Sequence, residues 1–174
     1  MLELIQGEGG IFMQDIAVVK KLEKTLKEKK LLLIIDEIQT GVYRSGNFLI
    51  SQYFKIKPDI ITLAKGLATG IPIGVMMTNV KDIFTFGDHG STFGGNHLST
   101  TVSCKVLDIL EKYSNSGTLQ ENIKFFDSYL LYFMNKYPNL FVQKNGHGFM
   151  QGLVLKDDTK LNELIKSSLK NGLL

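Results

Sequence analysis

The chain has 174 residues, of which 44% are hydrophobic and 21% are charged, a composition typical of a soluble globular protein with a sizeable core. Its net charge of +3 is too small to indicate nucleic-acid binding, and no apolar run approaches the ~20 residues of a membrane span. A single cysteine, Cys104, excludes an internal disulfide framework and fits a reducing compartment. No signal peptide is visible after Met1, so we predict a cytoplasmic protein.

The first predicted elements are the end of a strand in "LELIQ", residues 2–6, and a loop with the letters "GEGG". An amphipathic helix is predicted to begin at Asp15, because apolar residues recur at helical spacing after it. Lysines from Lys20 to Lys30 occupy the rest of that helix. We interpret them as a solvated helix face, with a nucleic-acid patch as the alternative.

Three strands are predicted in the next part of the chain. Five aliphatic residues, Leu31 to Ile35, indicate a strand buried on both faces, as in a parallel sheet. A glycine-containing loop, residues 41–46, and a short helical segment around residues 48–54 follow it. The second strand, in "DIITLA", ends near Lys65, and "IPIGVMMT", residues 71–78, is the third. Strands separated by helices predict an α/β protein with a mostly parallel sheet.

The remaining elements are mostly helical. A turn-rich segment, "GDHGSTFGGNH", precedes a helix predicted at about residues 98–113. The letters "NSG" break the chain before a second helix, at about residues 119–137. One strand, "GFMQGLVL", and a helix that reaches the C-terminus complete the pattern. Because the composition shifts after "NSG", we predict two domains, residues 1–115 and 116–174.

Asp36 and Glu37 end the first buried strand, at the sheet edge where ligands of parallel sheets bind. The magnesium-binding strand of a P-loop ATPase ends in the same way, but that class needs a phosphate loop of the form G-x-x-x-x-G-K-[ST]. No glycine within these residues begins such a loop. A purely structural alternative remains, in which Asp36 only caps the following turn.

Lys65 ends the second strand, so two parallel strands would place a carboxylate and an amine along one sheet edge. A neutral lysine amine forms a Schiff base with a carbonyl group. The residues around it are small, from Ala64 to Gly70, and leave room for a planar group against the backbone. Taken alone, a lysine at a strand end is more simply explained as a surface charge.

Three segments, "DEIQTG", "DIITLAKGLATGIPIG" and "GDHGSTFGGN", resemble the motifs of the class III pyridoxal-phosphate aminotransferases in order and spacing. "QGEGG" and "GHGFMQGLVL" also match, so the resemblance covers essentially the whole chain. It implies the large domain of a fold-type-I pyridoxal-phosphate enzyme, of which residues 1–115 form the later part. Residues 116–174 would then begin a small α+β C-terminal domain.

The resemblance implies roles for four residues at the two strand ends. Asp36 resembles the carboxylate that pairs with the pyridine nitrogen of the coenzyme and keeps the ring an electron sink. Ile38 resembles the residue packed on one face of the ring, and Gln39 the residue near its phenolic oxygen. Lys65 resembles the Schiff-base lysine, whose freed amine moves the proton from the substrate Cα.

Three further positions receive roles from the same resemblance. Thr92 resembles the threonine that reaches the coenzyme phosphate of the other subunit, which implies a homodimer. Ser91 matches a neighbour that contacts substrate from the same side. Glu8, in "QGEGG", resembles the acid that holds a substrate-binding arginine in reserve. No metal site is expected, because His89 and His147 are not spaced like metal ligands.

The implied reaction is amino-group transfer from N-acetylornithine, or a similar ω-amino compound, to 2-oxoglutarate, as in arginine biosynthesis. "QGEGG", "DEIQTG" and "GFMQG" favour that subgroup, while ornithine and 4-aminobutyrate remain alternative donors. Family members carry a phosphate loop and a ring-stacking aromatic upstream, and an arginine for the α-carboxylate downstream. We therefore expect a segment of such an enzyme, with a non-catalytic remnant as the alternative. Arg44, the only arginine, lies in a loop that varies in the family and receives no role.

Overall fold

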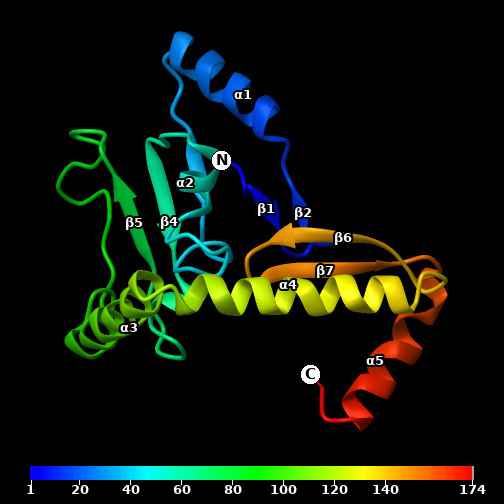
Figure 1. The fold of residues 1–174 in the computed structure, drawn as a ribbon. Coiled ribbons are helices and arrows are strands. Elements are labelled where there is room, and N and C mark those ends of the chain that lie inside the picture. Colours follow the sequence, from blue (N-terminus) through cyan, green and yellow to red (C-terminus); the bar gives the residue numbers. More distant parts are fainter. Residues whose placement is uncertain (174) are drawn as a thin grey trace.

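The structure, a computed structural model, describes residues 1–173 and begins with a small hairpin and a helix (Figure 1). Strand β1, Ile5–Gln6, pairs antiparallel with β2, Phe12–Met13. Helix α1, Ile16–Glu28, follows at once, and the Asp15 carboxylate caps it by accepting a hydrogen bond of 2.9 Å from the Val18 amide. The predicted start of this helix is therefore confirmed, because a side chain that satisfies a free amide fixes the first turn.

The central sheet has three strands, in the order β3, Ile34–Asp36, then β4, Ile60–Leu63, then β5, Val75–Thr78. Strands β3 and β4 are parallel, and their register places Asp36 beside Thr62. Strand β5 runs antiparallel to β4, so the prediction of a mostly parallel sheet is wrong for this pair. The connection between them contains only the short 3-10 helix η1, Lys65–Leu67, and a chain without a crossover helix reverses direction instead.

The predicted strand at residues 31–35 is shorter than expected. Leu31 and Leu32 are 54% and 48% exposed, and only Leu33 and Ile35 are buried. The Leu31 amide donates to the Leu26 carbonyl at 2.9 Å, so this residue still belongs to the end of α1. Pairing begins at Leu33, whose carbonyl accepts from the Asp59 amide at 2.9 Å.

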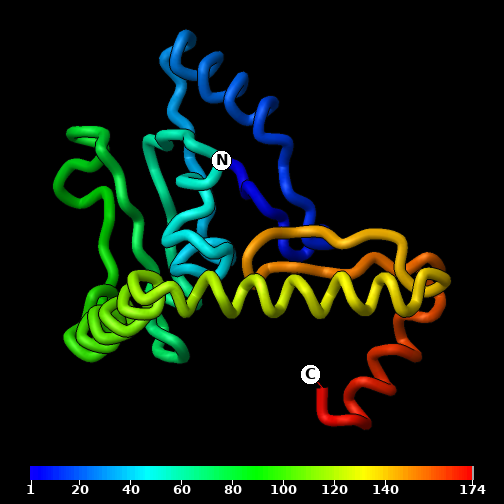
Figure 2. Tube along the Cα trace, in the orientation of Figure 1, coloured from blue at the N-terminus to red at the C-terminus, as the bar shows by residue number. Residues whose placement is uncertain are grey.

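The later part of the chain forms two long helices and a hairpin. Helix α3, His97–Asn115, and helix α4, Thr118–Lys136, are separated by Gly117, whose φ of +83° suits glycine. Strands β6, Phe141–His147, and β7, Met150–Leu155, pair antiparallel, and α4 runs alongside them (Figures 1 and 2). The sequence predicted only β7, because β6 carries polar residues and an Asn-Gly pair that indicate a loop.

The chain ends with the short 3-10 helix η2, Asp158–Lys160, and helix α5, Leu161–Lys170. Figure 2 shows α5 lying beyond the far end of α4, away from the central sheet. Within residues 1–173, no helix is both long enough and apolar enough to cross a membrane.

The hydrophobic core joins the first part of the chain to the β6–β7 hairpin. Its buried members come from β1, α1, β3, α2 (Ile50–Phe54) and the segment after it, together with one residue of the C-terminal hairpin: Leu4, Ile5, Val19, Leu33, Ile35, Ile50, Phe54, Ile56 and Met150. Because Met150 is only 7% exposed within this cluster, the β6–β7 hairpin is anchored to the first part of the chain. A second cluster, Val42, Leu63 and Leu67, packs against α3. The two clusters hold the segments after β3 and β4 in fixed positions between the sheet and the helices.

Candidate active site

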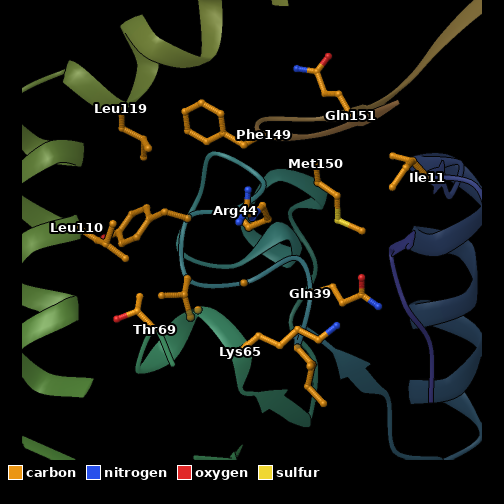
Figure 3. Close-up of a pocket in the computed structure, with 15 residues that line it drawn as sticks. Ile11, Gln39, Arg44, Lys65, Thr69, Leu110, Leu119, Phe149, Met150 and Gln151 are labelled. Atoms are coloured by element: carbon orange, nitrogen blue, oxygen red, sulfur yellow. The ribbon is translucent and has the colours of Figure 1, made fainter. Parts of the chain in front are cut away.

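A cavity of about 600 Å³ lies where the ends of β3 and β4 meet the helices and the C-terminal hairpin. Its walls come from Ile11 after β1, residues 38–44 after β3, residues 65–69 after β4, the helices α3 and α4, and residues 149–151 of the hairpin. Figure 3 shows these side chains converging on one space from segments far apart in the sequence. The volume is sufficient for a small organic ligand.

Backbone strain is concentrated around this cavity. Eight non-glycine residues of the described chain have positive φ, and the following five of them line the cavity: Ile11 (59°), Val42 (54°), Tyr43 (66°), Lys65 (43°) and Thr69 (40°). Such conformations are unfavourable for β-branched and bulky side chains, and they persist only where the surrounding structure enforces them. Their concentration at one cavity indicates that the fold sacrifices local stability to shape this site.

Asp36 stands at the end of β3, next to the cavity rather than in its wall. Its Oδ1 accepts hydrogen bonds from the Ile38 amide at 2.9 Å and from the Thr62 hydroxyl at 3.2 Å. The first bond confirms that Asp36 caps the turn after the strand. Among residues 1–173, no group donates to Oδ2, so one carboxylate oxygen is held in place and remains available to a ligand.

Lys65 follows β4 directly and lines the same cavity as Ile38 and Gln39. Its side chain is exposed and forms no hydrogen bond or ion pair with the described part of the chain. Figure 3 shows Lys65 extending towards Gln39 across the floor of the cavity. The structure therefore brings together three of the residues predicted from sequence, with Asp36 at the adjacent strand end.

Glu8, Ser91 and Thr92 lie outside the cavity wall. Glu8 is exposed in the turn after β1, but a Cβ at the preceding Gly7 would collide with the Gln39 side chain, so this turn lies against the site. Ser91 and Thr92 belong to an exposed loop between β5 and α3, where the Ser91 hydroxyl accepts from the Gly94 amide at 2.9 Å. Within this chain, neither residue is brought to Lys65.

Glu37, which the sequence left without a function, is the main support of the segment after β3. Its side chain is 1% exposed and accepts hydrogen bonds from the Thr40 hydroxyl (2.6 Å) and the amides of Ile50 (3.0 Å) and Ser51 (2.9 Å). A buried carboxylate needs such donors, and here they tie the loop to the start of α2. An acid adjacent to Asp36 was the only indication of this role in the sequence.

The β6–β7 hairpin also holds the loop at residues 41–46 in place. The Phe149 amide donates to the Arg44 carbonyl at 2.9 Å, and a Cβ at Gly148 would collide with the backbone of Ser45. The rings of Tyr53 and His147 lie 4.1 Å apart, and burial, followed by the nearby Lys144 ammonium, lowers the pKa of His147. These contacts make the hairpin part of the cavity wall, which the sequence did not predict.

The chain was compared with known proteins. The family model described as "Aminotransferase class-III" matches residues 1–174. The acetylornithine aminotransferase of Wolinella succinogenes is 50% identical over 174 residues, which are 100% of this chain and 44% of that protein. The chain therefore spans less than half the length of that relative.

The fold is shared by solved aminotransferase structures, two of which are the following. The acetylornithine aminotransferase of Elizabethkingia anophelis has a TM-score of 0.87 at 31% identity, over 99% of this chain and 44% of that one. An ornithine aminotransferase of Toxoplasma gondii, which shows partial occupancy of pyridoxal phosphate at its active site, has a TM-score of 0.87 at 30% identity, over 99% and 42%. The match along the whole chain and the arrangement of the strand ends around Lys65 lead to one conclusion: this chain belongs to the class III aminotransferases, which depend on pyridoxal phosphate.

Proposed function

We propose that the protein transfers an amino group from N-acetylornithine, or a similar ω-amino compound, to 2-oxoglutarate, in the manner of arginine biosynthesis. The observation that carries this proposal is the position of Lys65, an unpaired amine on a strained backbone in the same cavity as Ile38 and Gln39. The 50% identity to the acetylornithine enzyme of Wolinella succinogenes supports the choice of donor.

The residues of the site suit pyridoxal phosphate. The free Oδ2 of Asp36 would accept a hydrogen bond from the protonated ring nitrogen, Ile38 would pack on the ring, and Gln39 would lie near its phenolic oxygen. When bound, the coenzyme supplies an electron sink for negative charge at the substrate Cα. Lys65 would hold the coenzyme through its Nζ and would move a proton to and from the substrate Cα.

Glu8 and Ser91 are proposed to act on substrate from outside the described cavity. The turn that carries Glu8 lies against the Gln39 side chain, and this proximity supports a role in which Glu8 would hold an arginine in reserve. Ser91 would contact substrate from the exposed loop that also carries Thr92. We also propose that residues 1–115 and 116–174 belong to two domains and that the protein is cytoplasmic, as the lone exposed Cys104 suggests.

Comparing kcat/KM for three donors in the full-length enzyme tests the choice of substrate. We expect N-acetylornithine to exceed ornithine and 4-aminobutyrate by at least about 10-fold, because a site that binds a substrate's polar group discriminates strongly against analogues without it. The Toxoplasma gondii structure keeps ornithine as the second candidate. Equal values for the three donors would refute the choice of donor, and no turnover with any of them would favour a non-catalytic remnant.

A homodimer is the proposed assembly, because Thr92 would serve the coenzyme phosphate of the other subunit. The loop that carries Thr92 also has two highly exposed aromatic side chains, with exposed fractions of 109% for Phe86 and 83% for Phe93. Exposed apolar side chains of this kind are typical of a protein–protein interface. We expect sedimentation of the full-length enzyme to give a dimer, and Phe93→Ser to shift it towards monomer with a parallel loss of activity. A monomer that retains full activity would contradict this assembly.

A further inference from the structure

Gln39, which we propose to lie near the phenolic oxygen of the coenzyme, belongs to a tight turn after β3. The Glu37 carbonyl accepts from the Gly41 amide at 2.8 Å and closes this turn. Ile38 and Gln39 lie between these two residues, and both line the cavity. The shape of this turn therefore determines where the two side chains enter the cavity.

The side chain of Glu37 closes the same turn a second time. Its Oε2 accepts from the Thr40 hydroxyl at 2.6 Å and from the Ile50 amide at 3.0 Å, and its Oε1 accepts from the Ser51 amide at 2.9 Å. Glu37 and Thr40 are each 1% exposed, so water has little access to these bonds. Hydrogen bonds to a buried carboxylate are among the stronger ones in proteins. The turn is thus tied to the start of α2 through one side chain.

The Gln39 side chain depends on this turn for its position. Within residues 1–173 its amide forms no hydrogen bond of its own. It packs closely against the turn after β1, because a Cβ at Gly7 would come within 2.2 Å of the Gln39 Oε1. Figure 3 shows Gln39 beside the end of the Lys65 side chain. A displacement of the turn would therefore move an amide that is free to serve a ligand.

We propose that Glu37, through Thr40, is a positioning residue that holds Gln39 beside the phenolic oxygen of the coenzyme. The inference rests on the proposed function, which gives Gln39 that contact. Groups that contact a reacting ligand must stay within about 0.5 Å of their productive geometry, and residues behind them provide this precision. Glu37 meets the requirement, because its buried carboxylate joins the end of the turn to a helix that lies outside the cavity wall.

The test is a double-mutant cycle between Thr40→Val and Gln39→Leu in the full-length holoenzyme. Valine has nearly the shape of threonine but lacks the hydroxyl that donates to Glu37. Two properties of the bound coenzyme are measured: its Kd, and the pH at which its absorption changes, which responds to the groups around the phenolic oxygen. We expect both single variants to raise the Kd by about 3- to 10-fold and to shift that pH in the same direction. The double variant should shift the pH no further than Gln39→Leu alone, because Thr40 acts through Gln39.

Three further variants complete the experiment. Glu37→Gln should shift the pH at least as far as Thr40→Val, because an amide in place of the carboxylate leaves one donor without an acceptor. Thr40→Ser keeps a hydroxyl for Glu37 and should remain close to the parent. Ser103→Ala is the matched control: the Ser103 hydroxyl is also buried and donates to the Ser99 carbonyl at 2.8 Å, but it lies on α3 outside the cavity. This variant should leave both properties of the coenzyme unchanged.

An unchanged pH and Kd in Thr40→Val, or a shift that adds to that of Gln39→Leu, would overturn the proposal. Lower thermal stability as the only change in Thr40→Val, or its misfolding beside a folded Ser103→Ala, would do the same, because Glu37 would then only support α2. If Gln39→Leu itself shifts neither property, the role proposed for Gln39 fails together with this inference. Neither measurement needs turnover, so a failure of the proposed donor reaction leaves the result readable.

Discussion

Replacing Lys65 by alanine is expected to abolish covalent attachment of pyridoxal phosphate and to lower turnover by at least about 10⁴-fold. We expect a large loss because the proposed function gives one amine two tasks: it would hold the coenzyme, and it would move a proton at the substrate Cα. Among residues 1–173, no other lysine lines the cavity, so none of these lysines is positioned to replace it. Borohydride reduction of the full-length enzyme, followed by peptide mass spectrometry, should locate the coenzyme on Lys65 in the parent and nowhere in the variant.

Lys55→Ala is a matched control for this experiment. Lys55 is also exposed and also has positive φ, at 55°, but it lies at the end of α2 and outside the cavity. Both substitutions remove an exposed lysine with positive φ, so a general effect of such a change on folding should appear in both. Reduction that labels a different lysine, or normal turnover in Lys65→Ala, would remove Lys65 from its proposed role.

Much of the fold follows from local sequence patterns. The start of α1 at Asp15 and the break at Gly117 are readable because a single side chain or a single glycine determines each of them. The direction of β5 and the existence of β6 are not, because both depend on pairing with distant residues. Leu31 and Leu32 show the same limit. An apolar run predicts a buried strand, but the pairing with neighbouring strands decides at which residue that strand begins.

The residues of the candidate site also differ in whether the sequence predicts their position. Asp36 and Lys65 are predictable because polar residues at adjacent strand ends share one edge of a sheet. Arg44 is not, because its approach to the cavity depends on the positive φ of Val42 and Tyr43, which no residue preference predicts. Thr92 lies on an exposed loop, and its proposed partner belongs to another subunit, so the described chain leaves that role as a prediction.

Asp36→Asn is expected to leave the coenzyme attached to Lys65 but to lower kcat by about 10²- to 10³-fold. The amide oxygen can still accept from the Ile38 amide and the Thr62 hydroxyl, as Oδ1 does at 2.9 and 3.2 Å, so the turn should keep its shape. In the proposed site, however, the group that would face the ring nitrogen loses its negative charge. Without that charge the nitrogen would be less readily protonated, and the ring would accept negative charge from the substrate Cα less well.

Asp15→Asn is the matched control for Asp36→Asn. It also replaces a capping carboxylate by an amide, but at a position outside the candidate site. Asp15 also caps a backbone amide, that of Val18 at 2.9 Å, but it does so at the start of α1, outside the cavity. Asparagine caps helices about as well as aspartate does, so this variant should keep both its thermal stability and its kcat. If Asp36→Asn leaves kcat unchanged while borohydride still traps the coenzyme on Lys65, Asp36 is only a turn cap. If both variants lose kcat and stability together, the effect is structural. The loss of kcat in Asp36→Asn alone, at unchanged stability, is the result that assigns its carboxylate to the ring nitrogen.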